Sequence, residues 1–199
     1  SVRPCMPRRM LVAMQMEEFM TRRYELRFNR MKGCKEYRER HSLFTDYRPV
    51  TAEAVKSICF EAQLEGISAI EYDVQRYVDS RRVSHYWPIE EFLFDLPHWD
   101  GQDRIRALAD CVPCENKEWR DFFYIWFLSM VAHWLQMDRE HANSTSPLLV
   151  GPQGCRKSSF CQSLLPPELR PYYVDGIDLG SRKDAEMALN RFALINLDE

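Results

Sequence analysis

Leu148–Ser159 reads LLVGPQGCRKSS, and this stretch decides how the second half of the chain is interpreted. The apolar run Leu148–Val150 predicts a short buried strand, and a glycine-bearing loop follows it. Lys157 and Ser158 then open a predicted helix. The order of strand, glycine-bearing turn, Lys-Ser and helix is typical of a phosphate-binding loop.

In such a loop, backbone N–H groups surround a polyphosphate because glycine permits the sharp curvature. The predicted nucleotide-binding residues are Gly151, Pro152, Gln153, Gly154, Cys155, Arg156, Lys157, Ser158 and Ser159. Lys157 would act as a catalytic cation on the outer phosphates, and the Ser158 hydroxyl would bind Mg²⁺. Arg156 departs from the usual GxxxxGK[ST] pattern, because it stands in place of the second glycine. Its positive charge makes it the least damaging replacement beside an anion.

A second motif lies about 40 residues further along the chain, where the apolar run Phe192–Leu197 ends in Asp198 and Glu199. This is the form of a Walker B strand. Asp198 would bind the metal ion directly or through water, and Glu199 would act on the water that attacks the γ-phosphate. A buried strand with a solvated acidic end is the alternative. The order and spacing of the two motifs favour a nucleoside triphosphate site for ATP and Mg²⁺.

The composition is that of an ordinary globular protein, with 45% hydrophobic and 29% charged residues. The net charge of −3 provides no global basic field for nucleic acid, although a local patch remains compatible with it. Seven scattered cysteines without a secretory leader predict reduced thiols in a cytoplasm. The lone CxxC pair, Cys111 and Cys114, lacks further ligands at metal spacing. We expect no membrane partner, since the apolar run Phe122–Leu135 is too short to span a bilayer.

Three regions are predicted: residues 1–86, residues 87–145 as a helical lead-in, and residues 146–199 as the core that holds both motifs. In the first region, an apolar stripe predicts a helix over 10–23, and alternation predicts a β-hairpin over 24–40. Eight basic residues lie in or beside this hairpin: Arg22, Arg23, Arg27, Arg30, Lys32, Lys35, Arg38 and Arg40. Contact with nucleic-acid phosphates and a solvated face with interleaved acids both remain open.

Several helices are predicted between the hairpin and the phosphate loop. Two short ones joined by Glu65–Ile67, the second opened by a capping box at Ser68–Glu71, resemble a helix-turn-helix or winged unit. Trp87–Pro88 opens another, with Phe92, Leu93 and Leu96 facing inward. Residues 116–137 predict the longest helix, buried at the centre because it is apolar nearly all round. Beyond the loop, strands at 172–174 and 192–197 separated by a helix predict a parallel sheet.

Three strings resemble one family: LPHWDGQDRI, GPQGCRKSSF and DLGSRKDAEMALNRFALINLDE. They resemble the virulence-associated protein E family of P-loop proteins, which is similar to phage and plasmid primase-helicases of the superfamily 3 or AAA+ type. The hairpin YELRFNRMKGCKEYR is similar to the region that precedes this domain in Bacteroidetes members. The resemblance implies an α/β P-loop NTPase fold with a partial parallel sheet, truncated after the Walker B strand, behind a mainly helical N-terminal region with a β-hairpin.

The resemblance also implies an ATPase in the DNA replication of a mobile element, with single- or double-stranded DNA as partner and a homo-oligomeric ring in the full-length protein. A sensor strand and an arginine finger would follow Glu199, so we expect these 199 residues alone not to hydrolyse ATP. Three functions stay open: a helicase-like motor, a catalytically weak nucleotide-binding module that regulates or loads a primase, and a P-loop phosphotransferase. Arg156 favours the module, and the helical region before the loop disfavours the phosphotransferase.

Overall fold

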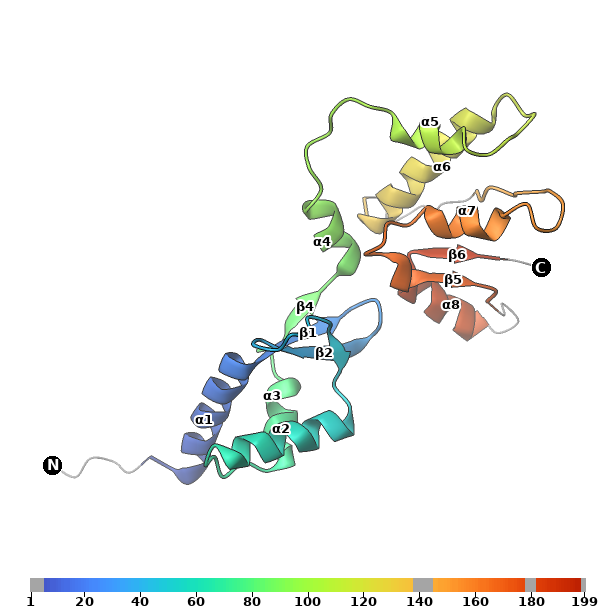
Figure 1. The fold of residues 1–199 in the computed structure, drawn as a ribbon. Coiled ribbons are helices and arrows are strands. Elements are labelled where there is room, and N and C mark those ends of the chain that lie inside the picture. The colour runs from blue at the N-terminus through green and yellow to red at the C-terminus, as the bar shows by residue number, and fades with distance from the viewer. Residues whose placement is uncertain (1–5, 138–144, 178–181, 198–199) are drawn as a thin grey trace. The chain divides into compact units, whose positions relative to one another are not determined.

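A computed structural model of the protein describes residues 6–137, 145–177 and 182–197. The chain divides into two compact units, Ser1–Trp87 and Pro88–Glu199 (Figure 1). The elements of the first unit are α1 (Arg8–Arg23), β1 (Tyr24–Asn29), β2 (Cys34–Glu39), β3 (Arg48–Pro49), α2 (Ala52–Leu64), α3 (Glu71–Val78) and β4 (Ser84–Tyr86). Those of the second are α4 (Pro88–Phe94), α5 (Arg104–Ala109), α6 (Trp119–Trp134), α7 (Lys157–Ser163), the 3₁₀ turn η1 (Arg170–Tyr172), β5 (Tyr173–Asp175), α8 (Arg182–Arg191) and β6 (Leu194–Asn196).

The first unit contains a sheet with the strand order β3-β2-β1-β4. β1 and β2 form the predicted antiparallel hairpin, with Tyr24 opposite Glu39 and Asn29 opposite Cys34. Gly33 lies in the turn with a φ of 66°, a left-handed conformation that glycine adopts without strain. β4 returns from the helices to pair with β1 in parallel. The predicted helix over 10–23 and hairpin over 24–40 are therefore confirmed.

Apolar side chains of three helices form the core of this unit beside the sheet. The predicted stripe on α1 is buried, and it packs with apolar residues of α2 and α3. Thr51 caps α2, since its hydroxyl oxygen accepts the N–H of Ala54 at 3.2 Å. The capping box predicted at Ser68–Glu71 is wrong. Ala69 is buried in the core, α3 begins only at Glu71, and the Asp73 carboxylate accepts the N–H of Ile70 at 3.1 Å.

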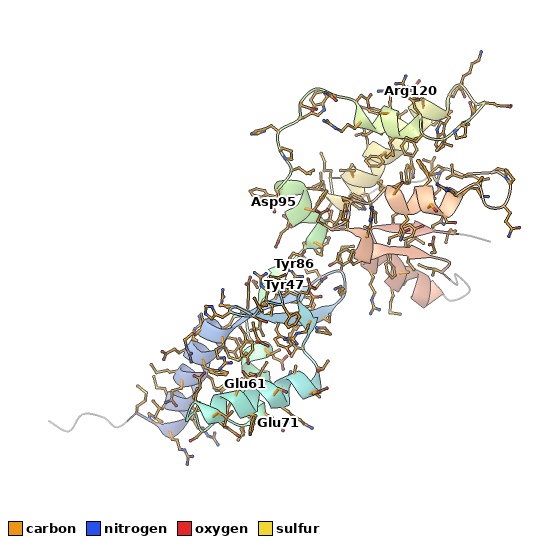
Figure 2. All side chains as sticks on the ribbon, in the orientation of Figure 1. Tyr47, Glu61, Glu71, Tyr86, Asp95 and Arg120 are labelled. Carbon is orange, nitrogen blue, oxygen red and sulfur yellow. The ribbon has the colours of Figure 1, made fainter. Side chains whose placement is uncertain are left out.

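A buried carboxylate joins the strands of the first unit. Glu36 on β2 is only 1% exposed, and its oxygens accept hydrogen bonds from Arg27 at 2.9 Å and from Lys32 at 2.8 Å. Burial opposes ionisation, but hydrogen bonds from Lys32, Arg27 and Asn29 outweigh it and lower the pKa of Glu36. The Arg27 guanidinium also lies 3.5 Å from the ring centre of Tyr47 and 3.6 Å from that of Tyr86 (Figure 2). One ion pair therefore connects four segments of the unit.

The second unit contains a parallel pair, β5 and β6, with Tyr173 opposite Leu194 and Asp175 opposite Asn196. The predicted strands at 172–174 and 192–197 are thus present. In Figure 1, α7 lies on one side of this pair and α8 on the other. Helix α7 packs through Phe160 and Leu164 on a core that includes Phe123 of α6. None of the helices in the described ranges is long and apolar enough to cross a membrane.

Three expectations about the second unit are wrong. Leu148–Val150 forms no strand, and Leu148 and Val150 are 85% and 88% exposed, because the segment has no ladder partner within the described residues. Helix α6 runs from Trp119 to Trp134 and is not buried throughout. Only Phe123 and Met130 are buried, whereas one face remains in solvent. Leu96 is exposed because α4 ends at Phe94.

Glu36→Gln should destabilise the first unit. The substitution keeps the shape of the side chain but leaves Arg27 and Lys32 without their anion, and losing one partner of a buried pair costs about 3 kcal/mol. The lowered pKa means that the stabilisation by Glu36 is complete above its ordinary value of 4.5 and is lost as the pH falls through the folded value. As the pH is lowered, the free energy of unfolding of Glu36→Gln should therefore decrease less than that of the parent.

Urea unfolding followed by circular dichroism, at about pH 7 and about pH 4, measures both effects. Glu39→Gln is the matched control, because Glu39 forms only an exposed ion pair with Arg48 and should lose at most about 1 kcal/mol. Equal losses in the two variants would contradict the assigned role of Glu36.

Candidate functional site

The loop between residues 150 and 157 surrounds the side-chain ammonium group of Lys157. Lys157 Nζ donates hydrogen bonds to the carbonyl oxygens of Gly151 at 2.9 Å and Pro152 at 3.2 Å. The same nitrogen lies 3.7 Å from the sulfur of Cys155, so the lysine bridges the start and the end of the loop. A Cβ at Gly151 would lie 3.1 Å from that sulfur, so a larger residue there would require the Cys155 side chain to shift.

Arg156 occupies the second glycine position of the motif and adopts the backbone conformation of a glycine. Its φ of 66° and ψ of 29° are left-handed, and it is the residue that precedes the first turn of α7. Such a conformation costs a non-glycine residue about 1–2 kcal/mol. The Arg156 carbonyl nevertheless accepts the N–H of Phe160 at 3.0 Å, so the helix starts normally. Its side chain is exposed to solvent.

All nine residues predicted to bind nucleotide lie in this loop and the first turn of α7. Helix α7 is positioned by its packing, since the rings of Phe160 and Phe123 lie 6.1 Å apart and Leu164 and Leu165 are buried. The two predicted acids, Asp198 and Glu199, lie outside the described residues. Strand β6, which leads to them, is held to α6 by a hydrogen bond of 2.9 Å from the Trp134 indole to the Ala193 carbonyl.

A polar cluster that the sequence reading missed lies at the carboxyl ends of β5 and β6. Asp175 Oδ1 accepts hydrogen bonds from the Tyr173 hydroxyl at 2.6 Å and from the Asn196 amide at 2.8 Å. Burial, and then the hydrogen bond to Asp175, raise the pKa of Tyr173, so the phenol remains a donor. Leu194 lies on the same face of β6 as Asn196 and packs in one core with Phe160 of α7, which places the cluster on the α7 side of the strands. The signal in the sequence was a polar residue near the end of each apolar run, Asp175 directly after the predicted strand at 172–174 and Asn196 within the one at 192–197.

Groups of three or more His, Cys, Asp or Glu side chains arranged as metal ligands do not occur in the described part of the chain. Cys111 and Cys114, the CxxC pair, are both exposed. Of the predicted Mg²⁺ ligands, Ser158 lies in the first turn of α7. A metal-ion site at the strand ends would depend on that hydroxyl together with Asp198.

The basic side chains around the hairpin of the first unit are largely engaged within the protein. Seven of the eight contact a carboxylate or a carbonyl: Arg22 and Arg23 pair with Glu65, Arg27 and Lys32 with Glu36, Lys35 with Asp79, Arg38 with Glu25, and Arg40 donates to the carbonyls of Thr21 and Tyr24. Arg30 stacks on the ring of Trp87. The first turn of α3 carries Glu71 and Asp73, so it is poorly suited to approach DNA phosphates as a recognition helix.

The comparisons with known proteins bear on the unit that contains the loop between residues 150 and 157. Residues 93–199, more than half of the chain, match the virulence-associated protein E-like domain. The chain belongs to this family. Family membership associates it with proteins of phages and plasmids. No curated protein and no solved structure matched the chain.

The matched range of the virulence-associated protein E-like domain includes the loop, α7 and the β5–β6 pair, whereas the hairpin unit lies before it. The loop geometry, the polar cluster and the strand leading to Asp198 therefore all belong to the family domain. The family match covers every residue that the sequence assigned to the nucleotide site.

The effect of a substitution at Arg156 on stability should depend on how well the new residue tolerates the left-handed backbone conformation. Arg156→Val should lower the free energy of unfolding by about 1–2 kcal/mol, because a β-branched residue tolerates positive φ poorly. Arg156→Gly should stay within about 1 kcal/mol of the parent, since relief of strain is offset by the greater freedom of the unfolded chain. Urea unfolding of both variants measures the difference. A valine variant as stable as the parent would show that residue 156 does not adopt this conformation.

Proposed function

We propose that the virulence-associated protein E-like domain binds ATP with Mg²⁺ at the loop Gly151–Arg156. The observation that carries the proposal is the position of Lys157, whose ammonium group is held inside the loop by two carbonyl oxygens. These acceptors are neutral, so an anionic phosphate oxygen would bind the same ammonium more strongly. The protein thereby keeps a cation ready where the outer phosphates would lie.

The backbone of the loop supports the same proposal. Gly154 and Arg156 are both left-handed, with φ values of 82° and 66°. Left-handed residues placed among right-handed ones turn successive N–H groups toward one side and form a concave site for anions. The first turn of α7 would add the Ser158 hydroxyl as a ligand of Mg²⁺. Phosphate binding would then be shared by the backbone, the lysine and the metal ion.

The proposed positions of Asp198 and Glu199 rest on the alternation of side chains along a strand. Side chains two residues apart on a strand share a face, so Asp198 is expected on the same face as Asn196. Asn196 is hydrogen-bonded to Asp175 and shares its face of β6 with Leu194, which packs with Phe160 of α7. Asp198 would therefore approach Mg²⁺ from the strand ends, and Glu199 would act on the attacking water. In a longer protein of this family, the site would drive a helicase-like motor on DNA, assembled as a ring.

A catalytically weak nucleotide-binding module is the second candidate, and the Arg156 backbone favours it. An arginine beside the phosphates adds attraction for the bound nucleotide, ground state and transition state alike. Uniform attraction of this kind improves binding without accelerating hydrolysis. The module would regulate or load a primase–DNA complex through nucleotide occupancy. ATP turnover measured with and without single-stranded DNA separates the two candidates, because only a motor should be stimulated.

Lys157→Ala should weaken the binding of Mg²⁺-ATP. Hydrogen bonds to charged groups contribute about 1.5–3 kcal/mol, which corresponds to a loss of about tenfold to 100-fold in affinity. Titration of a fluorescent ATP analogue into the full chain measures this loss. Lys117→Ala is the matched control, because Lys117 is an exposed lysine of the same unit that lies outside the loop.

Thermal unfolding of the Lys157→Ala variant should accompany the titration, because the lysine also holds the loop. If the variant unfolds like the parent and binds the nucleotide equally well, the proposed site is wrong. If neither protein binds it, with Mg²⁺ present, the proposal also fails.

A further inference from the structure

The loop between β2 and β3 carries two neighbouring apolar side chains in water. Leu43 is 99% exposed and Phe44 is 79% exposed. We propose that this tip is a nucleic-acid contact in which the Phe44 ring stacks on an unpaired base of a single strand. The contact lies in the first unit and does not depend on the nucleotide site proposed for the second.

Both ends of this loop are fixed to the strands. On one side, Arg40 Nε donates to the carbonyl oxygens of Thr21 at 2.9 Å and Tyr24 at 3.2 Å. On the other, Arg48 pairs with Glu39 at 3.0 Å, and the Tyr47 ring lies against the Arg27 guanidinium. The loop therefore presents its tip outward in a defined conformation, which reduces the entropy lost on binding.

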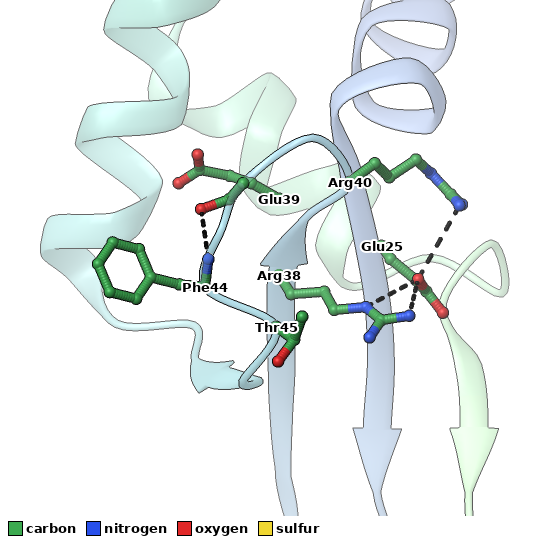
Figure 3. A pocket seen from close by; sticks show the side chains of 7 residues that line it. Glu25, Arg38, Glu39, Arg40, Phe44 and Thr45 are labelled. Carbon is green, nitrogen blue, oxygen red and sulfur yellow. Dashed lines mark hydrogen bonds and ion pairs between the residues drawn. The ribbon is translucent and has the colours of Figure 1, made fainter.

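The tip itself is shaped by one local hydrogen bond. Phe44 N–H donates to the Ser42 hydroxyl oxygen at 3.1 Å. Figure 3 shows this bond and shows the Phe44 ring pointing away from Arg38 and Glu25. Phe44 also lines a pocket of about 260 Å³ in which the carboxylates of Glu25 and Glu39 balance the guanidinium groups of Arg38 and Arg40, so the pocket offers no excess positive charge for a phosphate. The ring is therefore the part of this surface that suits a base.

The charge of the first unit favours a polyanionic partner. Residues 1–87 contain 16 Lys and Arg against 12 Asp and Glu, which gives a net charge of +4. Residues 88–199 contain 11 against 18, which gives −7, so a polyanion is attracted to the first unit and repelled by the second. Most cations near the tip are already paired with carboxylates. The excess positive charge is therefore spread over the unit and is not concentrated at the tip. A diffuse positive field with an exposed aromatic ring suits a single strand, where bases stack and phosphates stay solvated.

The test is the binding of a fluorescein-labelled single-stranded oligonucleotide of about 16 nucleotides to the full chain, followed by anisotropy at two salt concentrations. Phe44→Ala should weaken binding by about fivefold to 100-fold, as expected for the loss of one stacked base. Phe44→Trp should retain the affinity, because a larger ring also stacks. Phe60→Ala is the matched control, since Phe60 is 61% exposed on α2 of the same unit.

The dependence of affinity on salt should be the same for the parent and for Phe44→Ala, because stacking releases no counterions. Equal affinities of the parent and Phe44→Ala, or no binding by either, would overturn the proposal. So would a Phe44-dependent affinity for phosphatidylserine vesicles, or Phe44-dependent self-association, without affinity for the oligonucleotide. Binding of the fluorescent ATP analogue should not change in Phe44→Ala, which separates this proposal from the nucleotide site.

Discussion

The contact between the Lys157 ammonium and the carbonyls of Gly151 and Pro152 is the constraint on which the candidate site depends. It closes the loop, and Arg156, the residue of this loop immediately before α7, is left-handed. The strain at Arg156 can persist because the other end of the arrangement is fixed, with Phe160 packed on Phe123. The apolar core of the second unit thus supports an exposed polar loop.

The first unit is stabilised in a different way. Its helices share an ordinary apolar core, but its sheet is joined through the charged Glu36 and its partners. A buried charge with several donors permits few alternative arrangements, since each one would leave the carboxylate unpaired. The loop that carries Phe44 benefits from this, because Tyr47 at its end packs against the same arginine that binds Glu36.

Local signals allowed much of this fold to be predicted. The stripe on α1, the alternation in the hairpin and Pro88 at the start of α4 each reflect contacts within a short segment. Leu148–Val150 failed because a strand needs a neighbour for its backbone groups, and an apolar run does not reveal one. Similarly, Asp175 and Asn196 meet only through the register of β5 and β6, which is not encoded at either position alone. The start of α7 after the loop could be predicted because the motif is contiguous, whereas the binding of nucleotide by the loop residues and their relation to Asp198 stay predictions.

The opposite charges of the two units also affect how the protein behaves as a solute. The isoelectric point of about 6.0 describes neither half, because it averages a cationic segment with an anionic one. At low ionic strength, the cationic segment of one molecule attracts the anionic segment of another, and this head-to-tail attraction is screened within about 10 Å at 0.1 M salt. A cation exchanger should therefore bind the protein through its cationic first unit, and an anion exchanger should bind it through its anionic second unit.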